Sequence, residues 1–359
     1  MSIGDDEATL AAARAGDESA FAALVEPHRR ELRVHCYRML GSFDESEDLV
    51  QDTFLRAWKA IGGFTGRSTV RAWLYRIATN ACLDALDGRA RRILPHQVNE
   101  RNQVDERAGG EIAWLQPFPD RLWEPAAPSE TEPEGVAVAR ETIELAFLVA
   151  IQHLPPRQRA ALILRDVLGF TAAQTADFVE GSVASVNSAL QRARATLRQH
   201  LPERRLDWAP PADPTERERA VLRRYMDAVE RADLTAMAEL LAEDVRATMP
   251  PYLVWFADRD GVLGALAASW DPASPDFVGR FRMVPTRANG RPAAAAYVRL
   301  PDDEDYRAFA ISVLRVDGGR IVEMTAFHDV HLFRAFGLPM SFSPADRLNV
   351  GSHRHDGGK

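Results

Sequence analysis

Small polar and basic side chains between residues 182 and 194 have the chemistry needed to read DNA bases. On a helix that begins near Ser182, the outward positions carry hydroxyl, amide and guanidinium groups: Ser185, Asn187, Ser188, Gln191, Arg192 and Arg194. Asparagine and glutamine can form two hydrogen bonds with adenine in the major groove, and arginine can bond guanine or a phosphate. The spacing therefore predicts a duplex-DNA interface; a helical hairpin with a solvated polar face is the alternative.

Two helices and a tight turn must position these groups. Residues 171–179 have the period of a short amphipathic helix, Gly181 supplies the turn, and Ser182 is a suitable N-cap for the second helix. The second helix also has an apolar stripe at helical spacing, formed by Val183, Val186, Leu190, Ala193 and Leu197. This combination is typical of a helix-turn-helix, whose second helix enters the major groove.

A second candidate interface joins a polar loop to a basic, aromatic helix. Its members are Arg67, Ser68 and Arg71 in the loop, and Trp73, Arg76 and Asn80 off the apolar stripe of the helix. Rings that stack on bases and arginines that contact phosphates suit single-stranded nucleic acid, and a loop of small residues could hold an extruded base. Packing in the interior is the alternative for the rings. It is the expectation for Tyr75, while Trp73 fits either role.

A third surface lies on the helix predicted for residues 46–61. One face is an apolar stripe that should pack on a core, formed by Val50, Phe54, Ala57, Trp58 and Ile61. Another face carries Asp48, Gln51, Asp52, Leu55 and Lys59. A purely solvated face would mix charges of both signs, whereas this one places carboxylates and an amide in its first two turns. The clustering raises the question of a partner.

The whole chain has 359 residues and a formal net charge of −8, which argues against a simple nucleic-acid-binding protein. The charge is uneven, however: residues 56–92 carry eight basic and two acidic side chains, and residues 136–206 carry nine and six. Two basic segments suit a protein that binds nucleic acid at two places. The chain has no apolar run long enough to cross a membrane and no signal peptide. Cys36 and Cys82 lack metal-binding spacing, so buried free thiols in the cytoplasm are expected.

Periodicity and composition divide the chain into five parts. They are a helical domain at 8–92, an acidic, proline-rich linker at 93–135, a helical domain at 136–201, an α+β domain at 215–335 and a disordered tail at 343–359. The linker gathers six prolines and loses helical period, so it is expected to be mobile.

The α+β domain is predicted from the order of its elements. Two helices, at about 215–231 and 234–242, precede strand-like runs at 294–300, 306–316 and 321–327. This order predicts helices on one antiparallel sheet. The sequence Asp317-Gly318-Gly319-Arg320 should form a hairpin turn.

The same domain offers a candidate ligand pocket more than a catalytic site. Its walls would be Met249, Tyr252, Trp255, Trp270, Phe281, Phe327 and His328, with ordinary core packing as the alternative. No pair of acids, or acid and tyrosine, stands at a spacing that supports catalysis. His328 and His331 have a metal-like spacing without further ligands, so neither a metal nor another cofactor is expected.

These segments, in this order, resemble the extracytoplasmic-function (group 4) branch of the bacterial sigma-70 family. YRMLGSFDESEDLVQDTFLRAW resembles region 2.1–2.2, GGFTGRSTVRAWLYRIATNACLDALDGRARR resembles regions 2.3–2.4, and LPPRQRAALILRDVLGFTAAQTADFVEGSVASVNSALQRARATLR resembles region 4. The resemblance implies that Asp48, Gln51, Asp52 and Leu55 dock on the clamp helices of the polymerase β′ subunit. It also implies that the second candidate interface meets and melts the −10 promoter element. Region 4 would read the −35 element as duplex and contact the β flap.

Two features depart from the family pattern. Asn187 and Ala189 stand where many relatives have lysine and arginine, which predicts fewer phosphate contacts and a shallower salt dependence. Glu180 stands where many relatives have the glycine of the helix-turn-helix, and Gly181 follows it.

Residues 215–335 resemble the SnoaL-like, ketosteroid-isomerase-like cone domains, through ERERAVLRRYMDAVERADLTAMAELLAEDVRATMPP and VLRVDGGRIVEMTAFHD. Together the resemblances imply a cytoplasmic sigma factor without catalytic activity or membrane contact. Its partners would be the bacterial RNA polymerase core and promoter DNA. Its C-terminal domain would regulate it, under a small-molecule ligand or an anti-sigma factor. The alternatives are an isomerase- or cyclase-type enzyme fused to a DNA-binding portion, and a stand-alone helix-turn-helix regulator.

Overall fold

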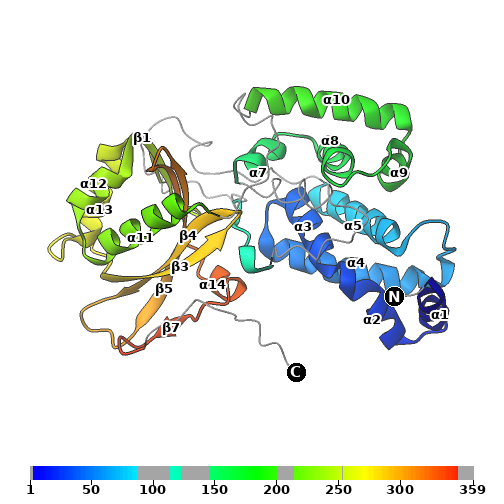
Figure 1. Cartoon of the computed structure of the whole chain (residues 1–359), viewed down its shortest axis with the longest axis horizontal. Coiled ribbons are helices and arrows are strands. Elements are labelled where there is room, and N and C mark those ends of the chain that lie inside the picture. Colours follow the sequence, from blue (N-terminus) through cyan, green and yellow to red (C-terminus); the bar gives the residue numbers. More distant parts are fainter. Residues whose placement is uncertain (1–2, 88–113, 123–144, 201–213, 253, 347–359) are drawn as a thin grey trace. The chain divides into compact units, whose positions relative to one another are not determined.

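The computed structural model describes residues 3–87, 114–122, 145–200, 214–252 and 254–346 (Figure 1). Within these ranges the chain forms two compact units. The helical unit contains 3–87, 114–118, 122 and 145–200, and the α+β unit contains 119–121 and the described residues from 214 onward. No helix in the described ranges is long and apolar enough to cross a membrane. Most of the predicted linker, and residues 347–359 of the predicted tail, lie outside the described residues.

The first part of the helical unit runs through α1 (Ile3–Arg14), α2 (Glu18–Val25), η1 (Glu26–His28), α3 (Arg29–Leu40), α4 (Phe43–Ala60), η2 (Ile61–Gly63) and α5 (Val70–Leu86). Side chains cap the helix starts: Asp17, Ser42 and Thr69 accept hydrogen bonds from backbone N–H groups in the first turns of α2, α4 and α5. Helix α3 contacts both α4 and α5 and is buried along most of its length, so it is the centre of this part.

Helix α3 buries polar side chains as well as apolar ones. His35 is fully buried, and its Nε2 lies 3.0 Å from Thr79 Oγ1 on α5. Burial, followed by the charge of Arg38, lowers the pKa of His35 to about 3, so the ring is neutral at physiological pH. Cys36 and Cys82 are buried free thiols, which confirms that prediction.

Residues 114–122, in the middle of the predicted linker, are packed. Leu115 and Phe118 are fully buried, and the Phe118 ring lies 4.9 Å from that of Tyr37 on α3. Gln116 accepts a hydrogen bond from Ser42 Oγ at 2.8 Å and donates one to Asp44 at 2.8 Å, both at the start of α4. This differs from the expectation of a mobile linker, because large apolar side chains among the prolines find a place to bury.

The second part of the helical unit consists of α7 (Leu145–Gln152), α8 (Pro156–Leu162), the π-helical turn η5 (Ile163–Val167), α9 (Ala172–Phe178) and α10 (Val183–His200). Helix α10 packs on α8 and α9 (Figure 1). Its buried stripe is the predicted one from Val186 onward: Val186, Leu190, Ala193 and Leu197. Val183 was also predicted to be buried, but it stands in the first turn and is 44% exposed.

Arg159 of α8 is a buried cation that joins the two parts of the helical unit. Its guanidinium donates hydrogen bonds to four main-chain carbonyls, those of Met39, Ile151, Gln152 and Leu154. Met39 lies in the last turn of α3, and the other three lie at the end of α7 or just beyond it. Carbonyls at helix C-termini lack partners within the helix and carry partial negative charge, so they suit a cation. Burial lowers the pKa of Arg159 to about 10, so the group remains charged at neutral pH.

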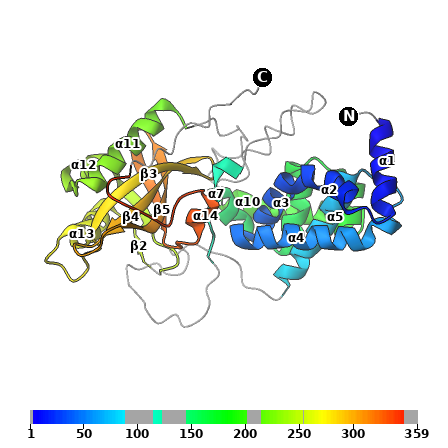
Figure 2. The same cartoon turned by 90° about the horizontal axis from the view of Figure 1, so that it is seen from below.

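The α+β unit also contains residues 120 and 121 of the short turn η4 (Asp120–Leu122). Its helices are α11 (Glu216–Glu230), α12 (Leu234–Leu240), α13 (Arg259–Trp270) and α14 (Leu332–Ala335). Its strands are β1 (Leu241–Thr248), β2 (Trp255–Phe256), β3 (Arg280–Ala288), β4 (Arg291–Arg299), β5 (Tyr306–Asp317), β6 (Arg320–Phe327) and β7 (Ser341–Phe342). They form one sheet in the order β2-β1-β6-β5-β4-β3, with β7 beside β5; Figure 2 shows it curved.

The predicted α+β class is confirmed, with one correction to the sheet. Strand β1 pairs with β6 in parallel, so the sheet is not wholly antiparallel. Sequence reasoning also missed β1, β3 and α13. The predicted turn at 317–320 is confirmed: Asp317 pairs with Arg320, and Gly318 and Gly319 have φ of 58° and 85°. Two consecutive positive φ values are what a two-residue hairpin turn of type I′ needs.

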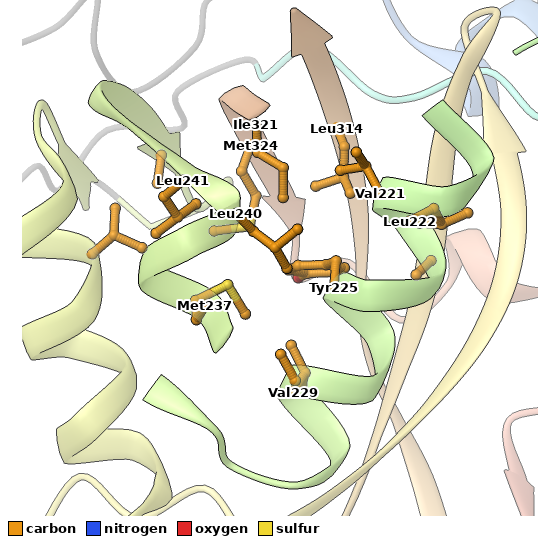
Figure 3. Packing of buried hydrophobic residues seen from close by; sticks show 14 of the residues in the cluster. Val221, Leu222, Tyr225, Val229, Met237, Leu240, Leu241, Leu314, Ile321 and Met324 are labelled. Atoms are coloured by element: carbon orange, nitrogen blue, oxygen red, sulfur yellow. The ribbon is translucent and has the colours of Figure 1, made fainter. Parts of the chain in front are cut away.

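Helices α11, α12 and α13 cover one face of the sheet and form a core with it (Figure 3). Val221, Tyr225 and Val229 recur at four-residue spacing on α11 and point toward this core. From the sheet, Leu314 and Met324 form a cross-strand pair on the same side. Strand alternation places residues three positions away on the opposite face, and this fixes which aromatic side chains can meet.

Candidate nucleic-acid and protein interfaces

The apolar face of α4 packs on the core, so the acidic face on the other side of the helix is exposed to solvent. Val50, Phe54 and Ala57 are buried, as the apolar stripe predicts. Asp48, Gln51 and Leu55 are exposed, and Leu55 stands out because 59% of this large apolar side chain is accessible. An exposed leucine among carboxylates and an amide is a feature of protein-binding surfaces, where an apolar contact sits inside a polar rim.

Asp52 differs from its neighbours on this face. Its carboxylate lies 2.8 Å from the guanidinium of Arg56, one turn later, and Arg56 also donates to Asp84 on α5 at 2.8 Å. The hydrogen bond from Arg56 to Asp84 raises the pKa of the guanidinium. Asp52 is half-buried and, through Arg56, belongs to a set of ion pairs that joins α4 to α5. The sequence pattern did not indicate this contact.

The residues of the second candidate interface differ in exposure. Arg67, Ser68 and Arg76 are exposed, and Asn80 is half-buried. Trp73 is only 5% exposed, and its ring lies 4.7 Å from that of Phe64. A base cannot stack on a ring that is already covered, so Trp73 packs in the interior in this structure, and its role in −10 contact stays a prediction.

Arg71 belongs to a network centred on the half-buried carboxylate of Glu31. Glu31 of α3 accepts hydrogen bonds from Arg71 Nε at 2.8 Å and from the Tyr75 hydroxyl at 3.2 Å, and it lies 2.6 Å from His28 Nδ1. Burial raises the pKa of Glu31, but the bonds from His28 and Arg71 outweigh it and hold the pKa below the usual value. Tyr75 is 1% exposed, which confirms the expectation that it is interior.

The helix-turn-helix has the predicted elements and an unexpected turn. Ser182 and Ser185 bond reciprocally: each backbone N–H donates to the other's hydroxyl, at 3.0 and 3.1 Å. The left-handed residue of the turn is Glu180, with φ of 51°, so the expectation that Gly181 supplies the turn is corrected. Because Ser185 serves as part of the cap, its hydroxyl is already occupied.

The outward side of α10 carries the remaining predicted readers. Asn187, Ser188, Gln191 and Arg192 are exposed in consecutive turns. Arg194 is exposed too, but it is paired with Asp166 of η5 through two bonds of 2.7 and 2.8 Å. The hydrogen bond to Asp166 raises the pKa of Arg194. A bidentate pair of this kind uses the same N–H groups that would bond guanine, so Arg192 is the better placed cation for base contact.

Comparisons with known proteins agree with this layout. Family models for Sigma-70 region 2, Sigma-70 region 4 and a SnoaL-like domain match residues 24–92, 144–197 and 222–324. The ECF RNA polymerase sigma factor SigG of Mycobacterium tuberculosis is 42% identical over 333 residues, which cover 91% of this chain and 85% of the relative. The chain belongs to the ECF RNA polymerase sigma factors.

Other matches show how the sigma factor divides. SigM of Mycobacterium tuberculosis is 33% identical over 196 residues, which cover 55% of this chain and 84% of the relative. The crystal structure of the Mycobacterium tuberculosis sigma factor SigJ covers 90% of this chain and 99% of its own, with a TM-score of 0.55 and 23% identity, and it shows the shared fold. In the terms of the family, residues 24–92 are region 2 and residues 144–197 are region 4.

In the α+β unit of this sigma factor, the predicted pocket residues do not share one face of the sheet. Trp270 belongs to the helix-side core, and Phe281 packs against that core. Phe327 pairs with Ile311 on the opposite face, three positions from Met324. The set predicted from the sequence is therefore split, because the register that assigns each residue to a face was not visible in the sequence.

Three further members of the set lie near the ends of strands. His328 packs edge-on against Phe309 at 4.8 Å and against Tyr252 at 5.3 Å. Burial lowers the pKa of His328 to about 4, and its Nε2 has no hydrogen-bond partner among the described residues. Trp255 pairs with Thr248, and Met249 donates its backbone N–H to Val254. Of the predicted set, Trp270 lies in the helix-side core and Phe281 packs against it, and His328 contacts Phe309, which packs against the same core.

A hollow of about 770 Å³ that sequence reasoning missed lies elsewhere on this unit. Its walls are the acidic β4–β5 loop at 302–305, with Arg307, Ala308, Val330, Met340 and Ser341. The run of four acidic residues in the loop is the signal that could have indicated it.

Replacing Glu180 with glycine should stabilise region 4 by up to about 1 kcal/mol. A side chain at positive φ brings its Cβ close to the carbonyl oxygen, which costs a non-glycine residue about 1 kcal/mol, and glycine removes the contact. Hydrogen exchange of peptides from α9 and α10 would measure the change. Glu180→Ala keeps the Cβ and serves as the control, so equal stability of the two variants would contradict the prediction.

Proposed function

We propose that this sigma factor binds the core polymerase through the exposed face of α4, with Gln51 and Leu55 at its centre and Asp48 beside them. The observation that carries the proposal is the exposure of Leu55 on an otherwise acidic surface. A single exposed leucine is common on protein surfaces, so the argument rests on its combination with the carboxylates and the amide of the same face, which gives an apolar contact inside a polar rim. The clamp helices of β′ are the partner that the family resemblance implies, and Asp52 contributes by holding Arg56 in place.

The promoter contacts follow from the exposed cations and amides. Arg67, Ser68, Arg76 and Asn80 are proposed to meet the −10 element, and Arg71 joins them when its bond to Glu31 is exchanged. Asn187, Ser188, Gln191 and Arg192 are proposed to read the −35 element, with Arg194 and Asp166 as a pair beside them. Arg192, Arg194 and Arg198 are the exposed cations of the described part of α10, and so small a number makes a shallow salt dependence the expected behaviour.

The α+β unit is proposed to regulate transcription without catalysis. The half-buried His328 faces the rings of Phe309 and Tyr252, an apolar setting that suits ligand contact better than proton transfer. A small molecule bound beside Trp270, Phe281 and His328, or an anti-sigma protein, would supply the signal. Deleting 207–359 should change the rate of run-off transcription with core polymerase, and an unchanged rate would remove this part of the proposal.

The Gln51→Ala/Leu55→Ala double variant should bind core polymerase at least about 30-fold more weakly than the wild type, since central interface residues are each worth about 2 kcal/mol. Fluorescence anisotropy with labelled sigma factor and unlabelled core measures the affinity, and run-off transcription measures the consequence. Arg192→Ala is the reciprocal control: it should keep core affinity and lose initiation at promoters that need the −35 element. Wild-type core affinity in the double variant would place the interface elsewhere.

A further inference from the structure

Asp166 holds one of the cations of α10 in a fixed geometry. Its two carboxylate oxygens accept hydrogen bonds from Nε and Nη2 of Arg194, at 2.8 and 2.7 Å. The two residues are 28 positions apart, so the pair joins η5 to α10 within region 4. Because both oxygens and two nitrogens are engaged, the pair fixes the plane of the guanidinium as well as its position.

The segment that carries Asp166 is held by the core of region 4. It is the π-helical turn η5, a rare conformation that occurs mostly at functional sites. The apolar side chains of the turn are buried: Ile163, Leu164 and Val167. The side chain of Asp166 is 23% exposed, against 55% for that of Arg194. The carboxylate is therefore the anchored partner of the pair, and it determines where the guanidinium lies.

Arg194 lies on the same flank of α10 as two of the proposed −35 readers. Asn187, Gln191 and Arg194 recur at i, i+4 and i+7, and all three are exposed. Seven residues of helix span about 10 Å, and the major groove is about 12 Å wide. When Asn187 reaches the bases, Arg194 therefore lies near the phosphates at the edge of the groove.

The carboxylate of Asp166 opposes a phosphate contact at this place. It occupies two of the N–H donors of Arg194 and cancels its charge, and it repels a phosphate that approaches the same guanidinium. Arginine adds to the salt dependence of DNA binding when it neutralises a phosphate and so releases a counterion. A guanidinium that stays paired with a carboxylate does neither.

We propose that Asp166 is a positioning residue that withholds Arg194 from the DNA phosphates and thereby sets the affinity of region 4 for duplex DNA. The inference rests on the proposed function, because it takes α10 as the helix that reads the −35 element. Sequence-independent binding is kept low in this way, so the side chains that contact bases carry a larger share of the binding free energy.

Asp166→Asn should release Arg194 to the DNA. One further phosphate contact steepens the fall of log K with log salt concentration by about 0.9. Taking the contact as worth nothing at about 1 M salt, the same slope makes binding about eight-fold tighter at about 0.1 M. A scrambled duplex should gain as much as the promoter duplex, because phosphate contacts do not depend on sequence.

The measurement uses the full-length chain bound to core polymerase. The probe is a fluorescent duplex with the −35 half of a promoter from which the wild type initiates in run-off transcription. Anisotropy titrations at salt concentrations from about 0.05 to 0.2 M give the slope. If the wild type initiates from no promoter, the proposed function fails; if it initiates and Asp166→Asn has the wild-type slope, only this inference fails.

The matched control is the same substitution in an Arg194→Ala background. It removes the same charge with no cation to release, so an equal gain in both backgrounds would overturn the proposal. Asp166→Glu keeps a carboxylate and should retain the wild-type slope. Weaker binding by Asp166→Asn, or a gain confined to the promoter duplex, would show that Asp166 presents Arg194 to a base, and would also overturn it.

Hydrogen exchange of α10 peptides checks that Asp166→Asn folds as the wild type does. If the variant loosens region 4, Arg194→Lys supplies the test from the other side of the pair. Lysine keeps the charge but cannot form two parallel hydrogen bonds with one carboxylate. The slope should then steepen as it does for Asp166→Asn, and a wild-type slope would overturn the proposal.

Discussion

Replacing Arg159 with methionine should lower the free energy of unfolding of the helical unit by about 3 kcal/mol and loosen region 4 from region 2. The substitution removes four hydrogen bonds from a cation to main-chain carbonyls. Bonds to a charged group are worth about 1.5–3 kcal/mol each, and the cost of burying the cation offsets part of their sum. The bonded carbonyls lie at or just beyond the C-terminal ends of α3 in region 2 and α7 in region 4. The substitution should therefore weaken the contact between the two regions.

Urea-dependent hydrogen exchange, read peptide by peptide in α3, α7 and α8, measures this effect. Arg157→Met is the matched control, because Arg157 lies two positions away, is exposed and, within the described ranges, makes one hydrogen bond, to the Val179 carbonyl at 3.2 Å. It should cost less than about 1 kcal/mol. Arg159→Lys keeps the charge with fewer donors and should fall between the two. If Arg157→Met and Arg159→Met lower the free energy of unfolding equally, the hydrogen bonds of the buried Arg159 guanidinium contribute no more than an exposed arginine does.

Acid should destabilise region 2 in a pH range set by His35. Thr79 Oγ1 donates its proton to the Tyr75 carbonyl at 2.7 Å, so Nε2–H of His35 is the donor to Thr79. A proton added at Nδ1 would be buried without a partner among the described residues. It would also lie near the charges of Arg38 and Arg71, with Glu31 offering partial compensation. The native ring therefore resists protonation.

The sign of the pH effect follows from the two pKa values of His35. The pKa is about 3 in the native state and 6.5 without the structure. Between these values the unfolded chain binds a proton that the native chain does not, so stability is complete above pH 6.5 and falls as pH drops toward 3. At about 1.4 kcal/mol per pH unit, the loss at pH 5 is about 2 kcal/mol.

A His35→Gln variant should show a flatter stability profile than the wild type between pH 7 and pH 5. The measurement is the urea midpoint of α3 and α5 peptides in hydrogen exchange at the two pH values. His331→Gln removes an exposed histidine of the α+β unit and should leave the wild-type slope intact. If His35→Gln keeps the full slope, other groups of region 2 carry the acid sensitivity.

Local pattern was sufficient to predict the elements that present the interfaces. Most of the apolar stripe of α4 and the stripe of α10 from Val186 are buried as their spacing predicts, and most of the opposite faces are exposed; Trp58 and Asp52 on α4 are half-buried. Helical period depends only on neighbours within a few turns, so one sequence is enough to see it. The same is true of the 317–320 turn, whose two glycines define its geometry.

Contacts between distant residues could not be predicted in this way. Arg159 bonds Met39, 120 residues earlier, and Gln116 bonds Ser42, 74 residues earlier. Nothing in the local sequence of either residue marks its partner. Trp73 was ambiguous for the same reason, because the ring that covers it, Phe64, lies across a loop. The predicted pocket residues do not form one site for a related reason. Which face of the sheet a residue lies on depends on the pairing of strands β1 and β3, and these strands were not predicted.

The packed segment around Gln116 and Phe118 also sets how far region 4 can travel from region 2. Measured from the end of α5 to the start of α7, the tether would have about 57 residues and a reach of about 190 Å. With Phe118 held between α3 and α4, the 26 residues from 119 to 144 separate it from α7, and a chain of that length spans at most about 90 Å even when fully extended. The anchor at Phe118 therefore roughly halves the largest distance by which region 4 can move away from region 2.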